Sequence, residues 1–440
     1  MFRRKEPSPS RKTGELFSSV EIQEGKLQDR YKPIYAESGL EGAEFEIRAA
    51  EDVYTPDGTL RYSAGEVVDT LTTGPDGTAT SKELYLGKFE IVETKAPHGM
   101  VINEEPIPVE LTYAGQEVSV TSTSVSVYNE RQKVLVKLFK DLEKDELFEI
   151  GTGDEILNVY FALYAAEDLT AADGSMIPAD GLIEVAGVQA DGTLTFSADL
   201  PIGSYYVKEY STNEHYLISD ETYPVVFEYG GQDTAVVEIV VNDGDAILNQ
   251  IIRGSISGIK VDETGEPLPG AVFGLFKRGL YRVYRRNAIL TAESAEDGSF
   301  SFTDVPYGIW QIKEISTVDG YVLSDEIFEV QIDEDGQVIE LGNIENKPIT
   351  GTVQTTKVDK TTPKSKLSGA VFVIYQDVNG NGTYDPDIDT LYGTMEETEQ
   401  GVYRLEGLPC GGYFLYEESA PDGYIKDDKY YFFEIREKAV

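Results

Sequence analysis

The chain has 440 residues, of which 79 are acidic and 37 are basic, so its formal net charge is −42. Binding to a phosphate backbone requires a basic surface, and this balance excludes nucleic acid as a partner. With 40% hydrophobic residues the chain can form packed cores, and its length predicts about three or four domains.

The first segment, residues 1–14, is basic and rich in Pro and Ser, and we expect it to be disordered. No run approaches the ~18 apolar residues of a membrane helix, so the sequence predicts no membrane span. Neither an export signal nor a sorting tail follows from the residues, and we expect the chain to be a fragment of a longer protein. Its one cysteine, Cys410, excludes an internal disulfide and has no His in its context that would make it a catalytic thiol.

One short pattern occurs four times along the chain, with Gly first, an aromatic residue two positions on, an aliphatic residue four on and Glu six on. Its copies are "GKFEIVE" from Gly87, "GSYYVKE" from Gly203, "GIWQIKE" from Gly308 and "GGYFLYE" from Gly411. The alternation is typical of a half-buried strand and places one glutamate per copy on the apolar face. These glutamates are Glu93, Glu209, Glu314 and Glu417.

Around these copies, runs rich in Val, Ile, Tyr, Phe and Thr alternate with turns rich in Gly, Asp, Asn and Pro, and helical patterns are absent. The sequence therefore predicts an all-β chain of four tandem β-sandwich modules of the immunoglobulin-like kind. We expect the modules to span residues 15–130, 131–250, 251–347 and 348–440.

The segments that connect the modules also repeat a pattern. In each, a lysine lies eleven residues after an asparagine, in "NERQKVLVKLFKD", "NQIIRGSISGIKVD" and "NKPITGTVQTTKVD". Strand alternation places each lysine inward, and it also places the asparagine that ends "VSVYN" inward. Each complete module is thus expected to bring Lys, Glu and Asn to one core. The residues are Lys140, Lys260 and Lys357 with Asn129, Asn249 and Asn346.

Such a triad has two interpretations. Burial lowers the pKa of a lysine and raises that of a glutamic acid, so a neutral amine could attack the Asn carboxamide while the acid passes protons to the leaving ammonia. The product would be an isopeptide bond, formed in one turnover by proximity and electrostatics without a cofactor. Alternatively, Lys and Glu form a buried ion pair and Asn caps a turn; recurrence of the triad favours the covalent interpretation.

With these motifs, and with "GAVFVIYQD" and "GKFEIVETKAPHG", the sequence resembles the B-type repeats of the collagen adhesin and the isopeptide-forming pilins of Gram-positive bacteria. The resemblance implies prealbumin-like sandwiches in which a first-strand Lys is joined to a last-strand Asn. It implies an extracellular protein, attached to the cell wall in its full length. When the residues of this family are matched to the present sequence, the resemblance implies two triads: Lys140, Glu209 and Asn249 in the second module, and Lys260, Glu314 and Asn346 in the third.

Two modules depart from this pattern. In the first, Glu93 and Asn129 match, but "SVEIQEGKLQDRYKP" offers only Lys26 and Lys32, outside the usual context, so its bond is in doubt. In the fourth, Lys357 and Glu417 match, but no Asn-bearing strand follows. We expect this module to lack its last strand, expose a strand edge and be the least stable of the four.

The segment "DVNGNGTYDPDID" has the oxygen-rich spacing of a calcium loop, with Gly382 at the sixth position and Ile388 where a Glu is usual. It also resembles the calcium loops of serine-aspartate-repeat surface proteins. A hairpin turn without metal explains the same residues equally well. The candidate ligands are Asp377, Asn379, Asn381, Thr383, Asp385 and Asp389.

No constellation for turnover of a small-molecule substrate is present, and His98 and His215 are interpreted as loop residues. We therefore expect a structural surface stalk. The alternative is an adhesin that binds a host or extracellular-matrix protein, through the insertion 141–157 or through Tyr281, Tyr284 and Arg285. The oligomeric state does not follow from the sequence.

Overall fold

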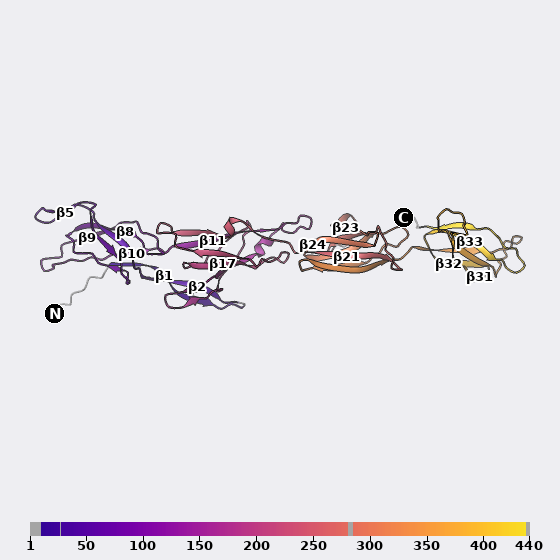
Figure 1. The fold of residues 1–440 in the computed structure, drawn as a ribbon, viewed down its shortest axis with the longest axis horizontal. Coiled ribbons are helices and arrows are strands. Elements are labelled where there is room, and N and C mark those ends of the chain that lie inside the picture. Colours follow the sequence, from indigo (N-terminus) through magenta and orange to yellow (C-terminus); the bar gives the residue numbers. More distant parts are fainter. Residues whose placement is uncertain (1–9, 27, 280–284, 437–440) are drawn as a thin grey trace. The chain divides into compact units, whose positions relative to one another are not determined.

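The computed structural model describes residues 10–26, 28–279 and 285–436, and throughout this part of the chain the regular elements are strands (Figure 1). The helical elements found there are three short 3-10 turns, which confirms the predicted all-β fold. They are η1 (Glu155–Asn158), η2 (Val241–Gly244) and η3 (Arg285–Asn287). No helix among the described residues has the length and apolar character needed to cross a membrane.

The third module shows the complete pattern, two sheets packed on a shared core. One sheet has the order β24-β21-β27 and the other β23-β22-β25-β26. The first strand, β21, runs parallel to the last, β27, and antiparallel to β24. The core between the sheets includes Phe273, Phe300 and Trp310. The strands are β21 (Arg253–Asp262), β22 (Val272–Lys277), β23 (Leu290–Glu293), β24 (Ser299–Pro306), β25 (Gly308–Ser316), β26 (Ile327–Ile332) and β27 (Gln337–Asn346).

The second module follows the same plan, except that η2 splits its last strand into β19 and β20, which both run parallel to β11. A small β13-β14 hairpin is added at its side. The strands are β11 (Lys133–Leu142), β12 (Tyr160–Ala165), β13 (Leu169–Thr170), β14 (Met176–Ile177), β15 (Leu182–Gly187), β16 (Thr193–Thr195), β17 (Gly203–Ser211), β18 (Thr222–Phe227), β19 (Val236–Val240) and β20 (Ile247–Asn249).

In the first module, the first strand begins earlier than predicted. Strand β1 (Ser10–Gln23) runs parallel to β10 from Arg11 to Gly14, so the expectation of disorder is wrong for residues 10–14; residues 1–9 lie outside the described part. The other strands are β2 (Arg30–Gly39), β3 (Glu44–Ala49), β4 (Val53–Tyr54), β5 (Leu60–Tyr62), β6 (Val67–Thr72), β7 (Thr78–Ala79), β8 (Gly87–Lys95), β9 (Ile107–Leu111) and β10 (Ser126–Asn129).

Strands β1 and β2 form a long hairpin that continues into the second module. Arg30 of β2 pairs in parallel with Leu182 of β15, and the Val20 N–H donates to the Ser175 hydroxyl. The two modules therefore share one eight-stranded sheet, and the described residues up to Ile251 form one compact unit while those from Ile252 onward form another. The predicted module boundaries did not anticipate this hairpin.

The fourth module has the sheets β28-β32-β31 and β30-β29-β33-β34. Strand β28 corresponds to β21, but no described strand pairs with it along the edge that β27 occupies in the third module. The strands are β28 (Thr350–Thr356), β29 (Val371–Gln376), β30 (Thr390–Thr394), β31 (Glu396–Glu399), β32 (Val402–Pro409), β33 (Gly411–Ser419) and β34 (Tyr431–Ile435).

Candidate functional site

The four recurring glutamates lie in the module cores, each 4% exposed or less and each directly across the sheet from a phenylalanine. Alternation along the strand brings them there. One backbone N–H, ten residues further along the chain, donates to each carboxylate at 2.7–3.0 Å. These donors are Asn103, Ser219, Ser324 and Asp427, and the sequence interpretation missed them because a backbone donor has no side-chain signature.

The lysines of the second and third modules are also buried, with Lys140 3% and Lys260 0% exposed. Neither Nζ contacts its glutamate directly. Lys140 Nζ donates to the carbonyl of Ile247 on the last strand at 2.8 Å, and Lys260 Nζ to that of Ile344 at 2.7 Å. Burial lowers the pKa of Lys140 to about 8, although Glu209 opposes the shift, and burial also lowers the pKa of Lys260.

The asparagines complete both sites. Asn249 Nδ2 donates to Glu209 at 2.7 Å, and Asn346 Nδ2 lies 2.9 Å from both carboxylate oxygens of Glu314. The same nitrogen also donates to Thr212 in the second module and to Thr317 in the third. Burial raises the pKa of Glu209, against the hydrogen bonds from Ser219 and Asn249.

Both asparagines have a buried Oδ1 without a hydrogen-bond partner in the structure, and Asn129 of the first module has the same feature. A buried carbonyl oxygen without a donor is costly, so natural proteins rarely leave one unpaired. Each of the three sites therefore has an asparagine Oδ1 that could accept a hydrogen bond from a protonated group.

The parallel pairing of first and last strand fixes the spacing of the triad. In three modules the asparagine pairs with the residue two positions beyond the lysine, in the registers Gly14 with Asn129, Leu142 with Asn249 and Asp262 with Asn346. In each, an apolar residue pairs with the lysine itself, and these residues are Val127, Ile247 and Ile344.

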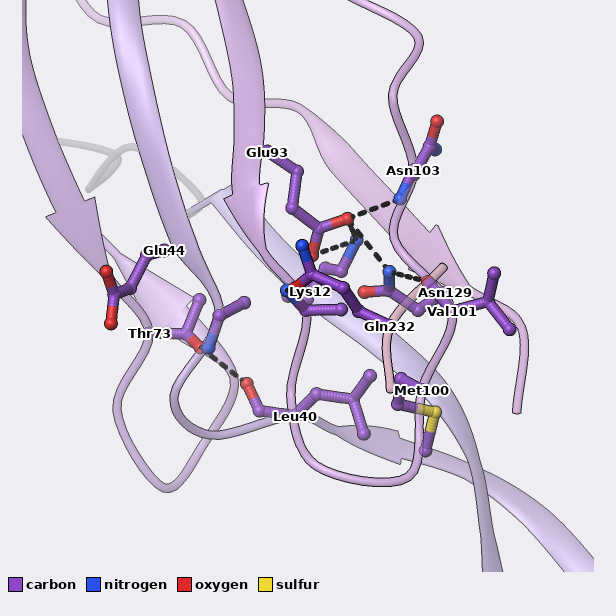
Figure 2. A network of polar contacts seen from close by, with 12 residues as sticks. Lys12, Leu40, Glu44, Thr73, Glu93, Met100, Val101, Asn103, Asn129 and Gln232 are labelled. Atoms are coloured by element: carbon purple, nitrogen blue, oxygen red, sulfur yellow. Dashed lines mark hydrogen bonds and ion pairs between the residues drawn. The ribbon is translucent and has the colours of Figure 1, made fainter. Parts of the chain in front are cut away.

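The lysine of the first module is Lys12, which the sequence interpretation placed in a disordered segment (Figure 2). Its Nζ lies 3.3 Å from both carboxylate oxygens of Glu93, and Asn129 Nδ2 donates to Glu93 at 2.8 Å. Burial lowers the pKa of Lys12, although Glu93 opposes the shift. All three members of the triad thus lie together in this module.

The predicted candidates Lys26 and Lys32 are wrong for this site. Both are exposed, and the Nζ of Lys32 lies 3.8 Å from Glu21 on the solvent side of the β1-β2 hairpin. Lys12 was missed because it lies within the polar run "SRKTG" and lacks the Lys-Val-Asp context of the other copies. Its only signal was its position ahead of the first apolar strand.

In the fourth module, Lys357 Nζ contacts Glu417 directly at 2.6 Å, and the lysine side chain is 18% exposed. No asparagine contacts them among the described residues of this module. The pair is therefore a two-membered version of the triad.

The candidate calcium loop lies between β29 and β30 and is stabilised by hydrogen bonds among its own residues. The Asp377 carboxylate accepts the N–H groups of Asn381 and Gly382, and the Asp389 carboxylate accepts those of Val378 and Asp385. In the described part of the chain no three His, Cys, Asp or Glu side chains gather as a metal site. Asn379, Asn381 and Asp385 also accept backbone N–H groups, those of Asn381, Thr383 and Asp387. Calcium binding stays a prediction.

Only some of the residues through which an adhesin could bind a host protein lie in the described part of the chain. Tyr281 and Tyr284 lie outside the described residues, and the side chain of Arg285 is not described. The insertion 141–157 folds back on its own module, where the Tyr216 hydroxyl donates to the carbonyl of Glu143. The structure thus adds no support for a ligand at either place, and adhesion stays a prediction.

Comparison with known proteins places all four modules in one family. The model of the SpaA prealbumin-like fold domain matches residues 34–125, 149–243, 254–347 and 351–440. No curated protein matches the chain. Among solved structures, the Bacillus anthracis TIE protein is 21% identical, with 96% of this chain and 71% of that chain covered and a TM-score of 0.50.

The major pilin subunit BcpA of Bacillus cereus is 18% identical over 77% of this chain and 100% of its own, with a TM-score of 0.32. A point mutant of the shaft pilin SpaA of Lactobacillus rhamnosus GG is 17% identical over 50% of this chain and 99% of its own, with a TM-score of 0.20. The prediction of four tandem prealbumin-like sandwiches is confirmed by the family match.

Proposed function

The chain belongs to the SpaA prealbumin-like fold domain family, and we propose that it is a structural stalk of tandem pilin-like modules that cross-link themselves. Its modules indicate a structural role in a pilus or at a surface. The finer proposal is one autocatalytic Lys–Asn isopeptide bond in each of the first three modules. The bonds join Lys12 to Asn129, Lys140 to Asn249 and Lys260 to Asn346.

One observation supports this proposal above the others, namely a buried Lys, Glu and Asn in the same register in three modules. An isolated buried lysine or glutamate is usually a paired structural charge. In the second and third modules, however, the Glu contacts the amide that would react, and the Lys is held by backbone carbonyls instead. This arrangement orients a nucleophile, an acid and an electrophile together.

The reaction follows from these contacts. The neutral Nζ of Lys140 attacks Cγ of Asn249, and the lowered pKa of the lysine increases the neutral fraction. Glu209, whose pKa burial raises, lies 2.7 Å from Nδ2 and can deliver the proton with which that nitrogen leaves as ammonia. One C–N bond forms, one breaks, and the proton lost by Nζ replaces the one that Glu209 gave.

Such a bond would serve the purpose that disulfides serve in other extracellular proteins, in a chain with a single cysteine. It closes a loop of nearly the whole module, which stabilises the fold by ~4 to 5 kcal/mol in the chain-entropy estimate. Because it joins the first strand to the last, it also carries a pulling force past the hydrogen bonds of the module. The proposed location is outside the cell, with attachment to the wall in the full-length protein.

Substitution of the acids tests the chemistry. Glu209→Ala and Glu314→Ala should each raise the mass of the folded chain by one ammonia beyond the change of the substitution itself, because the bond no longer forms. Glu228→Ala, an exposed position in the second module, is the matched control and should leave the bonds intact. Bonds that still form without Glu209 and Glu314 would contradict their role.

The first module allows a separate test, because three of its lysines are candidates for the isopeptide bond to Asn129. Lys12→Ala should restore one ammonia, whereas Lys26→Ala and Lys32→Ala should not, because only Lys12 reaches Glu93. Peptide mapping of the folded chain should find Lys12 linked to Asn129. A link from Lys26 or Lys32 would overturn the assignment.

A further inference from the structure

The loop that follows β8 in the first module contacts two members of its triad. This loop comprises residues 96–103. The N–H of Asn103 donates to Glu93 at 2.8 Å, and the carbonyl of Val101 accepts from Asn129 Nδ2 at 2.6 Å. The position of the 96–103 loop therefore decides where the acid and the carboxamide lie relative to each other.

The first module lacks a contact that the second and third modules have at the start of this loop. There, the first loop residue is a threonine whose hydroxyl accepts from the asparagine Nδ2, at 2.9 Å for Thr212 and 2.7 Å for Thr317. In the first module the corresponding residue is Ala96, which has no hydroxyl. Other contacts must therefore fix the loop in this module.

The second module supplies such contacts through Gln232, which lies in the 228–235 loop between β18 and β19 (Figure 2). Its side-chain Oε1 accepts the N–H of Ala96 at 3.0 Å, and its backbone carbonyl accepts the N–H of Ile102 at 2.9 Å. One residue of the second module thus binds the 96–103 loop near both of its ends.

The corresponding loop position is more exposed in the other two modules. Ile102 is half-buried and packs against a cluster that contains Ala96 and Met100. Its counterparts Ile218 and Leu323 are 50% and 43% exposed. The first module, which lacks the threonine, is therefore the one whose loop is covered by its neighbour.

The 228–235 loop is itself held in shape by Gln132, which is 1% exposed. The side-chain amide of Gln132 donates to the carbonyls of Gly231 and Thr234 at 3.1 and 2.6 Å and accepts the N–H of Gly230 at 2.8 Å. The corresponding loop of the third module, between β26 and β27, is shorter. Extra length and a buried amide thus present this loop to the first module.

The second module also binds the strand that carries the amine. Lys12 lies on β1, and further along this strand the carbonyls of Phe17 and Ser18 accept the N–H groups of Ala172 and Asp173. The second module thus contacts both the strand of the nucleophile and the loop beside the carboxamide.

We propose that Gln232 is a positioning residue for the cross-link of the first module, and that this link forms only after the second module has folded. The inference rests on the proposed function and adds an order of formation to it. The second module needs no such help, because the printed contacts of Glu209 and Asn249 come from its own residues.

The joining step itself is unchanged. Nζ of Lys12 forms a bond to Cγ of Asn129, the bond from Cγ to Nδ2 breaks, and the nitrogen leaves as ammonia. Glu93 gives a proton to the departing nitrogen and receives the one that Nζ loses. Gln232 takes no part in these transfers and acts by keeping the carboxamide and the acid in a reactive geometry.

The test follows the full chain during cell-free synthesis, with samples quenched in denaturant at intervals and the links of each module quantified by peptide mapping. Gln232→Ala should slow formation of the Lys12–Asn129 link by roughly 3- to 10-fold, the effect of one hydrogen bond on a barrier. The link of the second module should form at its usual rate. Asp233→Ala, an exposed neighbour in the same loop, is the matched control and should slow neither.

A conservative variant separates positioning from a general effect on folding. Gln232→Glu keeps an oxygen acceptor for the Ala96 N–H on a side chain of the same length, so it should restore the rate of the first link. If Gln232→Ala slows the first and second links equally, Gln232 only stabilises its own module and the positioning role is overturned. An unchanged first link in Gln232→Ala, or no rescue by Gln232→Glu, would also overturn it.

Val207→Asp tests the order of formation, because Val207 is 0% exposed in the core of the second module and a buried charge there prevents folding. The links of the first and second modules should both be lost, while that of the third still forms. A first link at its usual rate in this variant would overturn the order. In that case the proposed function stands, whereas an unsubstituted chain without any link would refute both.

Discussion

The third and fourth modules carry the same lysine and glutamate, but only in the third do the described residues include the strand that ends in asparagine, and the contrast shows what this strand contributes. In the third module, Glu314 contacts the amide of Asn346 while Lys260 donates to the carbonyl of Ile344. In the fourth, where no described strand occupies this edge, Glu417 contacts Lys357 directly. The last strand thus supplies both the amide and the carbonyl that holds the amine apart from the acid.

A buried lysine and glutamate in the same core therefore need not contact each other directly. Two opposite charges in a core attract each other strongly, and separating them requires other partners. The carbonyls of Ile247 and Ile344 provide such partners for the amine, and the asparagine amide provides one for the acid. The first module is intermediate, because Glu93 contacts both Lys12 and Asn129.

We expect the greatest loss of stability when the acid of the third module is removed. Trp310 is the only tryptophan and is buried in this module, so its fluorescence reports the unfolding of that module within the full chain. Glu314→Ala should lower the free energy of unfolding by ~4 to 5 kcal/mol, because the loop between Lys260 and Asn346 is no longer closed. Chemical denaturation followed at Trp310 measures the change.

Glu209→Ala is the matched control, since it removes the equivalent acid from the second module. It should leave the Trp310 transition unchanged. An equal loss for both variants, or no loss for Glu314→Ala, would show that the stability of the third module does not depend on its own cross-link.

A smaller effect should appear as a pH dependence when the amine is kept but cannot react. In Asn346→Ala, burial still lowers the pKa of Lys260 below its usual 10.5, so the unfolded chain binds more protons than the folded one between the two values. The free energy of unfolding should therefore rise as pH increases toward 10.5, by about 1.4 kcal/mol per unit of pKa difference.

The control for this experiment is Asn346→Ala combined with Lys260→Met, which removes the titrating group. Its Trp310 transition should lack the additional rise with pH. A stability that falls with pH in Asn346→Ala relative to this control would mean that the buried amine is held in its charged form.

The smallest effect concerns Thr317, which accepts a hydrogen bond from Asn346 Nδ2 at 2.7 Å. The first module has Ala96 at the equivalent position, so the hydroxyl is not a general requirement of the site. Thr317→Ala should lower the free energy of unfolding by roughly 1 kcal/mol, while the bond in the third module still forms. Denaturation at Trp310 and the mass of the folded variant measure the two outcomes, and loss of the bond would assign Thr317 a positioning role.

Much of the fold and site could be predicted because the period-2 pattern of a strand decides which side chains face inward. This placed Glu93, Glu209, Glu314 and Glu417 in the cores, and the repeated spacing connected Lys140 and Lys260 with Asn249 and Asn346.

Other features depend on tertiary pairing that no local pattern records. Lys12 lies in a strand because Val127 of β10 pairs with it on one side and its N–H donates to the carbonyl of Gly77 on the other, although "SRKTG" itself has no apolar alternation. The carbonyls that bind Lys140 and Lys260 are fixed by a parallel register between segments at opposite ends of a module. Thr212 and Thr317, in contrast, could have been found by aligning "KEYST" with "KEIST".

The intact mass of the folded chain is the decisive measurement for the proposed cross-links. We expect a mass below that of the sequence by three ammonias, one for each of the first three modules, with Lys357 of the fourth module unmodified. A folded chain at its full sequence mass would contradict the cross-linked stalk and leave the buried triads as structural ion pairs.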